Sequence, residues 1–258
     1  YGVVGHKTHA KIALVVRREE GRLMRYVHLG TGNYHPRTAR LYTDFDLLTC
    51  RPEICADVNE VFQQLTGLGK ASKLRLVWQS PFTLHQRVLE AIEDETRAAR
   101  AGRPAAIAAK MNALLEPDVI EALYRASQAG VKVDLVVRGV CALRPGVPKL
   151  SENIRVRSIV GRFLEHTRIF RFANGGDAKV WLSSADWMDR NFFRRIEIAF
   201  PVLDPKLARR IVREGLRPYL DDNTQAWEMR SDGSFARRKR GRGKKRCAQA
   251  ELLSALAG

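Results

Sequence analysis

Two histidines in the sequence each stand two residues before a basic residue: His9 before Lys11, and His166 before Arg168. Each pair opens an apolar, β-branched segment, and a turn and a second apolar segment follow. The second segments end in small and polar residues, Leu-Gly-Thr-Gly-Asn up to Asn33 and Leu-Ser-Ser-Ala-Asp up to Asp186. The spacing from the histidine to this last residue is 24 in the first copy and 20 in the second.

This repeat has the groups needed for phosphoryl chemistry. Side chains alternate along a strand, so a histidine and the basic residue two positions later point to the same face. Imidazole can attack phosphorus or exchange a proton with a leaving oxygen, and the cation neutralises phosphate oxygens. A turn of small residues offers backbone N–H groups to an anion. Two such copies predict two histidines on opposite sides of one phosphorus.

A histidine at the start of a strand is more often a half-buried packing residue than a catalytic one. The repeat favours the catalytic interpretation, because packing poorly explains two histidines with matching neighbours. His6 and His9 are not predicted to share a metal ion, because a spacing of three on an extended segment points them apart. The remaining histidines lack this context and are interpreted as ordinary residues: His28, His35 and His85.

The surrounding pattern predicts an α/β protein. Residues 10–16 and 22–29 form a predicted hairpin, and residues 56–65 a helix. Gly67 and Gly69 break the pattern, so a domain junction is predicted near residue 75. Helices are predicted over residues 83–100 and after Pro117 up to Gly130, and the last packed helix over residues 206–219. Strands are predicted over residues 105–109, 131–137 and 154–160.

Charge and composition narrow the class further. The net charge is +17, and eight of these charges lie between residues 237 and 246, which leaves +9 for the rest. A hydrophobic content of 45 % excludes disorder of the whole chain, and the residual charge favours an anionic partner. No apolar stretch is long enough for a membrane span, and four scattered cysteines suggest a reducing, cytoplasmic location.

The hairpin copies resemble the H-x-K and G-[ST]-x-N elements of the phospholipase D superfamily. More closely, the chain resembles the C-terminal catalytic half of the family-1 polyphosphate kinases. The matching stretches are residues 9–11, 28–44 (HLGTGNYHPRTARLYTD), 109–147, 151–170 (SENIRVRSIVGRFLEHTRIF) and 174–191 (NGGDAKVWLSSADWMDRN). Neither copy completes the longer H-x-K-x-x-x-x-D motif, since Val16 and Ala173 stand where the carboxylate would be.

The resemblance implies two phospholipase D-like α/β domains related by pseudo-symmetry, with the first truncated at its N-terminus. The first domain is expected at residues 1–75 and the second at 76–230, followed by a basic C-terminal tail at 231–258. The basic tail alone is typical of a solvated or nucleic-acid-binding arm. The chain is expected to be a fragment of a longer protein, because it opens at Tyr1 close to an apolar strand.

The resemblance also implies the activity, which is reversible transfer of the ATP γ-phosphate to inorganic polyphosphate through a phosphohistidine. His9 matches the phosphorylated histidine, and His166 matches a second histidine that binds nucleotide phosphate and protonates or orients the leaving group. Tyr42 and Arg138 match positions that contact ATP, and Lys11 is expected to clamp phosphate. Four further cations are proposed from charge and position alone: Arg40, Lys110, Arg168 and Arg195.

Mg²⁺ is the implied cofactor, with its ligands expected before Tyr1, so no metal ligand is assigned. The implied partners are ATP or ADP and inorganic polyphosphate, with no specific nucleic acid, and a homo-oligomer is expected for the full-length protein. Two alternatives remain open at this point. One is a phospholipase D-like nuclease or phosphodiesterase, and the other is a non-enzymatic, basic nucleic-acid-binding protein.

Overall fold

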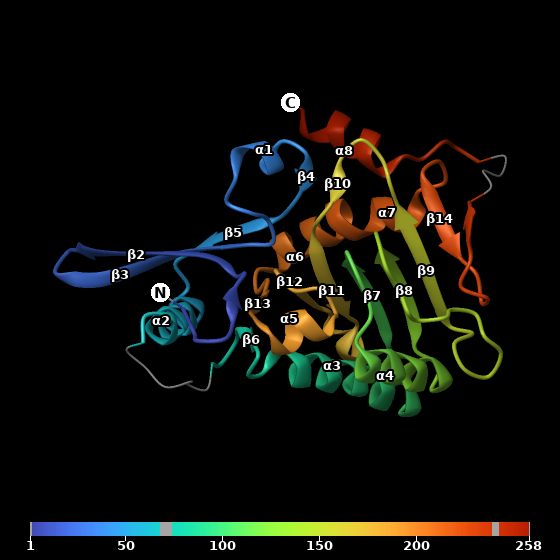
Figure 1. Ribbon diagram of the computed structural model, residues 1–258, viewed down its shortest axis with the longest axis horizontal. Coiled ribbons are helices and arrows are strands. Elements are labelled where there is room, and N and C mark those ends of the chain that lie inside the picture. The colour runs from blue at the N-terminus through green and yellow to red at the C-terminus, as the bar shows by residue number, and fades with distance from the viewer. Residues whose placement is uncertain (1, 68–73, 239–242, 258) are drawn as a thin grey trace.

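The computed structural model describes residues 2–67, 74–238 and 243–257. Its centre is a ten-stranded mixed sheet in the order β1-β13-β12-β11-β7-β8-β9-β14-β15, with β6 also paired to β13 (Figure 1). The bounds of these strands are Lys7–Thr8 (β1), Trp78–Ser80 (β6), Ala106–Met111 (β7), Lys132–Val137 (β8), Ile154–Ile159 (β9), Arg168–Phe172 (β11), Lys179–Ser183 (β12), Arg195–Pro201 (β13), Ala226–Met229 (β14) and Phe235–Arg237 (β15).

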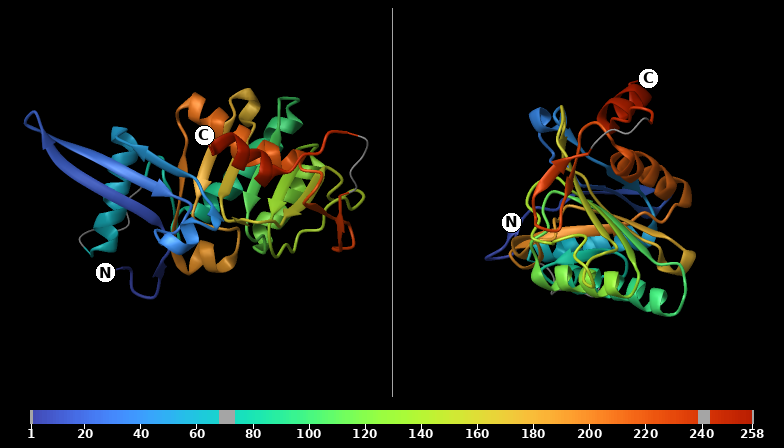
Figure 2. Two further views of the ribbon diagram at one scale, coloured as in Figure 1. Left: turned by 90° about the horizontal axis from the view of Figure 1, so that it is seen from above. Right: turned by 90° about the vertical axis from the view of Figure 1, so that its right-hand side faces the viewer.

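Helices cover both faces of this sheet. The amphipathic helices α3 (Leu84–Arg100) and α4 (Pro117–Gln128) pack below it in Figure 1, and α6 (Pro205–Ile211), α7 (Arg217–Asp221) and α8 (Ala248–Leu256) lie on the other side (Figure 2). β7, β8 and β9 run parallel to one another, and most of their side chains are buried on both faces of the sheet. This is the arrangement expected for parallel strands covered by helices. The predicted α/β class is confirmed.

The N-terminal part adds a smaller antiparallel sheet beside the main one. It consists of β2 (Lys11–Glu19), β3 (Arg22–Gly30) and β5 (Asp46–Thr49), and α2 (Pro52–Leu65) packs against it (Figure 1). The predicted hairpin is therefore present, with Lys11 paired to Gly30 at its base. A second apolar core joins the two sheets, because residues such as Leu29 and Ile54 pack in one cluster with Ile169 and Phe200.

Short elements complete the structure. The strands β4 (Tyr42–Thr43) and β10 (Leu164–Glu165) pair with each other in parallel. The short helices are α1 (Pro36–Ala39), α5 (Asp189–Phe193) and a 3₁₀ turn at Asn174–Gly176. Among the described residues, no helix combines the length and apolar character needed to cross a bilayer.

The C-terminal region differs from its expectation. The helix predicted over residues 206–219 is interrupted by a π-helical turn, Val212–Leu216, which separates α6 from α7. The expected start of the tail, residue 231, lies in the turn between the antiparallel strands β14 and β15, and α8 is a further packed helix beyond it. The main-chain N–H of Ala248 at the start of α8 donates to Asp222, which is fully buried. Residues 239–242 and 258 of the expected tail lie outside the described part of the chain.

Candidate active centre

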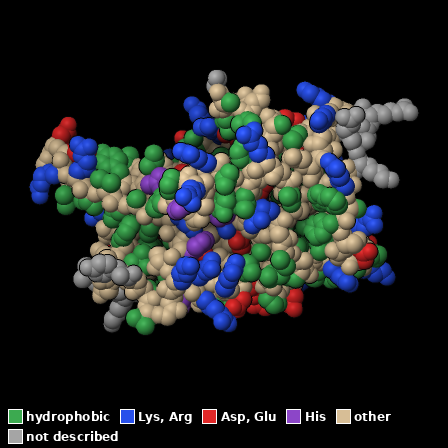
Figure 3. Space-filling model, turned by 45° about the horizontal axis from the view of Figure 1, so that its top comes forward, with side chains coloured by type: hydrophobic (Ala, Val, Ile, Leu, Met, Phe, Trp, Pro, Cys, Tyr) green, Lys and Arg blue, Asp and Glu red, His purple; other side chains and the backbone are tan. Residues whose placement is uncertain are grey.

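A cleft of about 400 Å³ brings the two repeat copies together. Both histidines, His9 and His166, line it, together with Tyr42 and Arg138. Of the cations proposed from charge, Arg168 and Arg195 also line this cleft. On the face seen in Figure 3, histidine side chains lie near the middle with Lys and Arg side chains close by. Both histidines, both predicted ATP-contacting residues and two of the four further cations therefore converge in one place.

His9 is held in a defined orientation at the entrance to β2. Its Nδ1 lies 2.8 Å from Oε2 of Glu197, and its Nε2 lies 2.9 Å from Nζ of Lys11. Glu197 is fully buried and also accepts hydrogen bonds from Ser184 and Asn191. A carboxylate at Nδ1 stabilises the tautomer with its proton there, which leaves the lone pair on Nε2. The His9 nitrogen that carries the lone pair is therefore the one beside Lys11.

His166 repeats this arrangement with different residues. Its Nδ1 lies 2.9 Å from Oδ1 of Asp44, and NH1 of Arg168 donates to its Nε2 across 3.0 Å. Burial lowers the pKa of His166, and the cation of Arg168 adds to this effect while the hydrogen bond to Asp44 opposes it. His166 is therefore neutral near pH 7, with Nε2 as a hydrogen-bond acceptor.

The two orienting carboxylates belong to the repeat, and sequence reasoning missed them. Asp44 accepts a hydrogen bond from Thr31, 13 residues earlier, and Glu197 accepts one from Ser184, also 13 residues earlier. Thr31 and Ser184 occupy matching places in the two polar turns. The signal in the sequence was thus an acidic residue 13 positions after the matching residue of each polar turn. It was hard to interpret because each carboxylate binds the histidine of the other copy.

Strand pairing brings each carboxylate to the opposite histidine. β1 pairs with β13 so that Lys7, two residues before His9, lies opposite Arg195, two residues before Glu197. β10 pairs with β4 in the same way: Leu164, two residues before His166, lies opposite Tyr42, two residues before Asp44. The two registers match position for position.

The copies differ in the charge beside each histidine. Asp186, at the end of the second polar turn, binds Arg168 through two hydrogen bonds of 3.1 and 2.9 Å. Although burial opposes it, Arg168 holds the pKa of Asp186 below its usual range, so this pair stays ionised. The matching residue of the first copy is the neutral Asn33. The cation beside His9 therefore lacks the carboxylate that neutralises its counterpart.

Lys11, whose Nζ lies beside Nε2 of His9, has a pKa below the usual lysine value. Burial lowers its pKa to about 8, with the Glu197 carboxylate opposing the shift. The ammonium group is charged at neutral pH, although the Lys11 residue is only 6 % exposed. A buried, charged donor beside a nucleophilic nitrogen is suited to hold a phosphate oxygen.

Arg138 is connected to the same network through Asn112. Its Nε donates to Oδ1 of Asn112 across 2.8 Å, and the main-chain N–H of Asn112 donates to Asp186. Asn112 also donates to the main-chain oxygen of His166. The guanidinium of Arg138 is thus fixed at the rim of the cleft by a residue that sequence reasoning did not single out.

Two of the proposed cations lie elsewhere. Lys110 is 1 % exposed, forms a 2.6 Å ion pair with Glu165 and lies 3.6 Å from the ring centre of Tyr219. Lys110 does not line the cleft, because β7 directs its side chain into the core beside β10. Arg40 lines a different cavity, described next.

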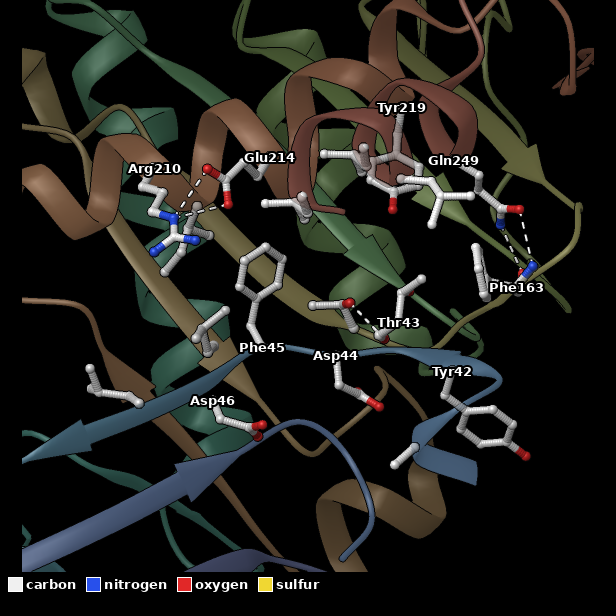
Figure 4. A pocket seen from close by; sticks show the side chains of 18 of the residues that line it. Tyr42, Thr43, Asp44, Phe45, Asp46, Phe163, Arg210, Glu214, Tyr219 and Gln249 are labelled. Carbon is white, nitrogen blue, oxygen red and sulfur yellow. Dashed lines mark hydrogen bonds and ion pairs between the residues drawn. The ribbon is translucent and has the colours of Figure 1, made fainter. Parts of the chain in front are cut away.

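A larger, mostly apolar cavity of about 620 Å³ lies on the other side of β4 (Figure 4). Tyr42, Thr43 and Asp44 form one wall, and α6 contributes Arg210, which binds Glu214. Tyr42 borders both cavities. The larger cavity contains none of the repeat histidines, so the chemistry is placed in the smaller one.

The residues described in and around this cleft do not offer a suitable set of ligands for Mg²⁺. Its carboxylates, Glu197, Asp44 and Asp186, are each engaged by a histidine or an arginine. In residues 2–67, 74–238 and 243–257, one group has metal-ligating atoms close together: His85, Glu116 and Asp118. Glu116 caps α4 and binds His85 across 3.1 Å, and a histidine with a capping carboxylate does not suit Mg²⁺, which prefers oxygen and water ligands.

Comparison with known proteins agrees with this geometry. The family described as Polyphosphate kinase C-terminal domain 1 matches residues 1–71, and the family described as Polyphosphate kinase C-terminal domain 2 matches residues 77–249. A polyphosphate kinase from Paraburkholderia phytofirmans is 64 % identical over 257 residues, covering 98 % of this chain. One from Burkholderia cenocepacia is 66 % identical over 246 residues, covering 94 %.

The chain spans 37 % and 36 % of the lengths of these two relatives. The crystal structure of polyphosphate kinase from Porphyromonas gingivalis superposes with a TM-score of 0.92 at 39 % identity, over 99 % of this chain and 39 % of that one. The family matches together cover nearly the whole sequence, and the relatives share about two thirds of its residues. The chain belongs to the polyphosphate kinase family.

Proposed function

We propose that the protein takes part in reversible transfer of the ATP γ-phosphoryl group to inorganic polyphosphate, with a phosphohistidine at His9 as the intermediate. The observation that carries this proposal is the hydrogen bond from His9 Nδ1 to the buried Glu197, with Nε2 directed toward Lys11 in a basic cleft. The similarity to polyphosphate kinases supports the choice of substrates.

In the first half-reaction, the Nε2 lone pair of His9 forms a bond to the γ-phosphorus while the bond to the bridging oxygen of ADP breaks. The leaving electron pair stays on that oxygen, and Glu197 stabilises the positive charge that develops on the ring. In the second, a terminal polyphosphate oxygen attacks the phosphorus and the P–N bond breaks. Lys11 and the arginines of the cleft stabilise the phosphoryl oxygens in both steps.

The charge difference between the copies favours His9 over His166 as the nucleophile. Lys11 has no carboxylate like Asp186 beside it, so its charge remains free to attract phosphate, whereas Arg168 is neutralised by Asp186. The lowered pKa of His166 makes it a poor proton donor at neutral pH. We assign His166 to orienting the nucleotide phosphates, together with Tyr42, whose ring centre lies 5.0 Å from the His166 ring, and Arg138.

The proposal is tested by incubating the protein with ATP labelled with ³²P at the γ position and measuring acid-labile label on the chain. We expect His9→Gln to lose the label and the control His28→Gln, a change outside the cleft, to keep it. Glu197→Gln keeps the shape of its side chain but removes its charge, and it should slow labelling about 100-fold. Label retained on His9→Gln contradicts the proposal. Cleavage of a DNA phosphodiester without labelling would identify the nuclease alternative instead.

The remaining expectations are part of the same proposal. We place the junction of two pseudo-symmetric, phospholipase D-like domains near residue 75, supported by the family matches that end at 71 and begin at 77 and by the matching registers around the two histidines. The four free cysteines support a reducing, cytoplasmic location. Mg²⁺ as a cofactor, a homo-oligomeric full-length protein and the lack of a specific nucleic-acid partner follow from the family resemblance.

A further inference from the structure

A second basic cleft lies away from the active centre, between the outer face of α6 and the far ends of β11 and β12. Its volume is about 780 Å³, and five cations line it with a single carboxylate, Asp177. The cations are Arg171, Lys206, Arg209, Arg213 and Arg217. Neither the proposed mechanism nor the family resemblance uses any of them.

The π-helical turn aligns three of these arginines. Arg209, Arg213 and Arg217 follow one another at intervals of four residues. On a regular α-helix a residue eight positions later is rotated by about 80°. A π turn takes up about one residue more than an α turn, so eight residues that include Val212–Leu216 make close to two whole turns. The three guanidinium groups therefore form a row along one wall.

Most of this charge is available to a ligand. Arg213 is paired with Glu214, which also binds Arg210, and Arg217 is paired with Asp221, at 2.9 and 3.8 Å; both of these arginine side chains are exposed. Arg171, Lys206 and Arg209 have no ion pair within the part of the chain that the structure describes. Because the guanidinium groups of Arg213 and Arg217 are exposed, their ion pairs contribute little to stability and leave both groups accessible to an anion.

The lining also indicates the kind of anion. The floor and walls between the cations are small and aliphatic, with Val180, Ala208 and Val212, and the cleft has no aromatic side chain among its described lining. Sites for single-stranded nucleic acids use aromatic rings to stack bases. A row of cations without stacking groups fits a polyanion that has no bases.

We propose that this cleft is a second binding site for linear polyphosphate, which holds a distant part of a long chain while its end reacts at His9. This inference rests on the proposed function for the identity of the polymer. Arg171 lies three residues beyond Arg168 on β11, about 10 Å along the strand and on the opposite face. A short phosphate oligomer can occupy only one of the two clefts, whereas a long chain can bind both and gains affinity from the second contact.

The test compares polyphosphate of about one hundred phosphates with tripolyphosphate, by titration of the protein at several salt concentrations. The cleft variant is Arg209→Gln/Arg213→Gln/Arg217→Gln. The control is Arg17→Gln/Arg18→Gln/Arg22→Gln, which removes the same charge from exposed positions on the β2–β3 hairpin. Thermal unfolding of each variant checks its fold, and Lys206→Gln/Arg209→Gln supplies a milder change at the same site.

We expect the cleft variant to bind the long polymer about tenfold more weakly, with a salt dependence reduced by about 2 in log–log slope. The milder variant should show a smaller loss in the same direction. The control should change the affinity less than twofold, and tripolyphosphate binding and His9 labelling should be unaffected in all of them.

Equal losses in the cleft variant and the control would attribute the effect to net charge and overturn the site. An unchanged affinity for the long polymer would overturn it as well. Single-stranded DNA of matched charge that binds as tightly, with the same loss in the cleft variant, would make the cleft a nucleic-acid site instead. Failure of His9 labelling in the unmodified protein would refute the proposed activity, but a specific loss of polymer binding would still establish the cleft.

Discussion

Glu197 and Asp44 each hold the histidine of the opposite repeat copy through Nδ1. A carboxylate at this position fixes both the tautomer and the ring plane of an imidazole. This arrangement explains how the site works without the acidic residue of the longer H-x-K-x-x-x-x-D motif, whose positions are Val16 and Ala173. The residue that distinguishes the copies is then Asp186, which neutralises Arg168 while Lys11 stays free.

The lowered pKa of Lys11 predicts an upper pH limit for the labelling of His9. Burial lowers it to about 8, so the ammonium group loses its proton, and its hold on phosphate, as the pH rises through that value. We expect His9 labelling to fall with a midpoint near pH 8. In Lys11→Arg the guanidinium stays charged, so this alkaline decline should move beyond pH 10, whatever the absolute rate.

The measurement is the initial labelling rate between pH 6 and 10.5, with Lys7→Arg as the control, because Lys7 is exposed on the neighbouring strand β1. An identical alkaline decline in Lys11→Arg and in the unmodified protein would show that another group sets this limit. The same pKa has a consequence for stability. Because the folded-state pKa lies below the unfolded value, the burial cost is present below about pH 8 and disappears as the pH rises toward 10.5.

The helix α8 packs against the rest of the protein, where the sequence predicts a solvated tail. Gln249 is 5 % exposed, and its side chain binds Oε1 of Glu165 across 2.6 Å and both main-chain polar groups of Phe163. Glu165 and Phe163 lie in or beside β10, immediately before His166. Glu165 also accepts a hydrogen bond from Thr43 on β4. The C-terminal helix therefore braces the paired strands that support the second histidine.

Removing this brace should reduce stability. Gln249→Ala leaves an oxygen of the buried Glu165 and the main chain of Phe163 without partners, and we expect the free energy of unfolding to fall by about 1–3 kcal/mol. Ser254→Ala on the exposed side of the same helix is the control and should change it by less than about 0.5 kcal/mol. Urea titration followed by circular dichroism measures both, and equal effects would mean that the Gln249 contacts do not brace β10.

In the whole molecule, one of the apolar cores is built by both family regions, and the main sheet carries it into contact with the core of the second region. Ile54 on α2 belongs to the same buried cluster as Ile169 on β11 and Phe200 on β13. The strand pairs β1–β13 and β4–β10 add main-chain hydrogen bonds across the same boundary. The junction near residue 75 therefore separates two parts of the sequence but does not separate two independent cores.

A shared core predicts cooperative unfolding. Ile54→Ala in the first region and Leu135→Ala in the second should each lower the free energy of unfolding by about 2–5 kcal/mol, because both side chains are almost completely buried. Both should shift one common transition, seen at the same urea concentration by circular dichroism and by tryptophan fluorescence. An early, separate transition in Ile54→Ala would show that the N-terminal region unfolds independently.

The sequence alone determined the local parts of this protein. The spacing of His9 from Lys11 and of His166 from Arg168 predicts the candidate reactive groups, because residues two apart on a strand share a face. Local signals likewise predict the hairpin β2–β3 from two apolar runs around a turn, α3 from apolar periodicity, and α4 from Pro117 and Gly130 at its ends. Tertiary structure decided what depends on distant contacts. Glu197 lies 188 residues from His9, and Asp44 lies 122 from His166, so no local pattern pairs them. Lys110, proposed from its charge alone, is instead buried against Glu165, because its strand turns it into the core.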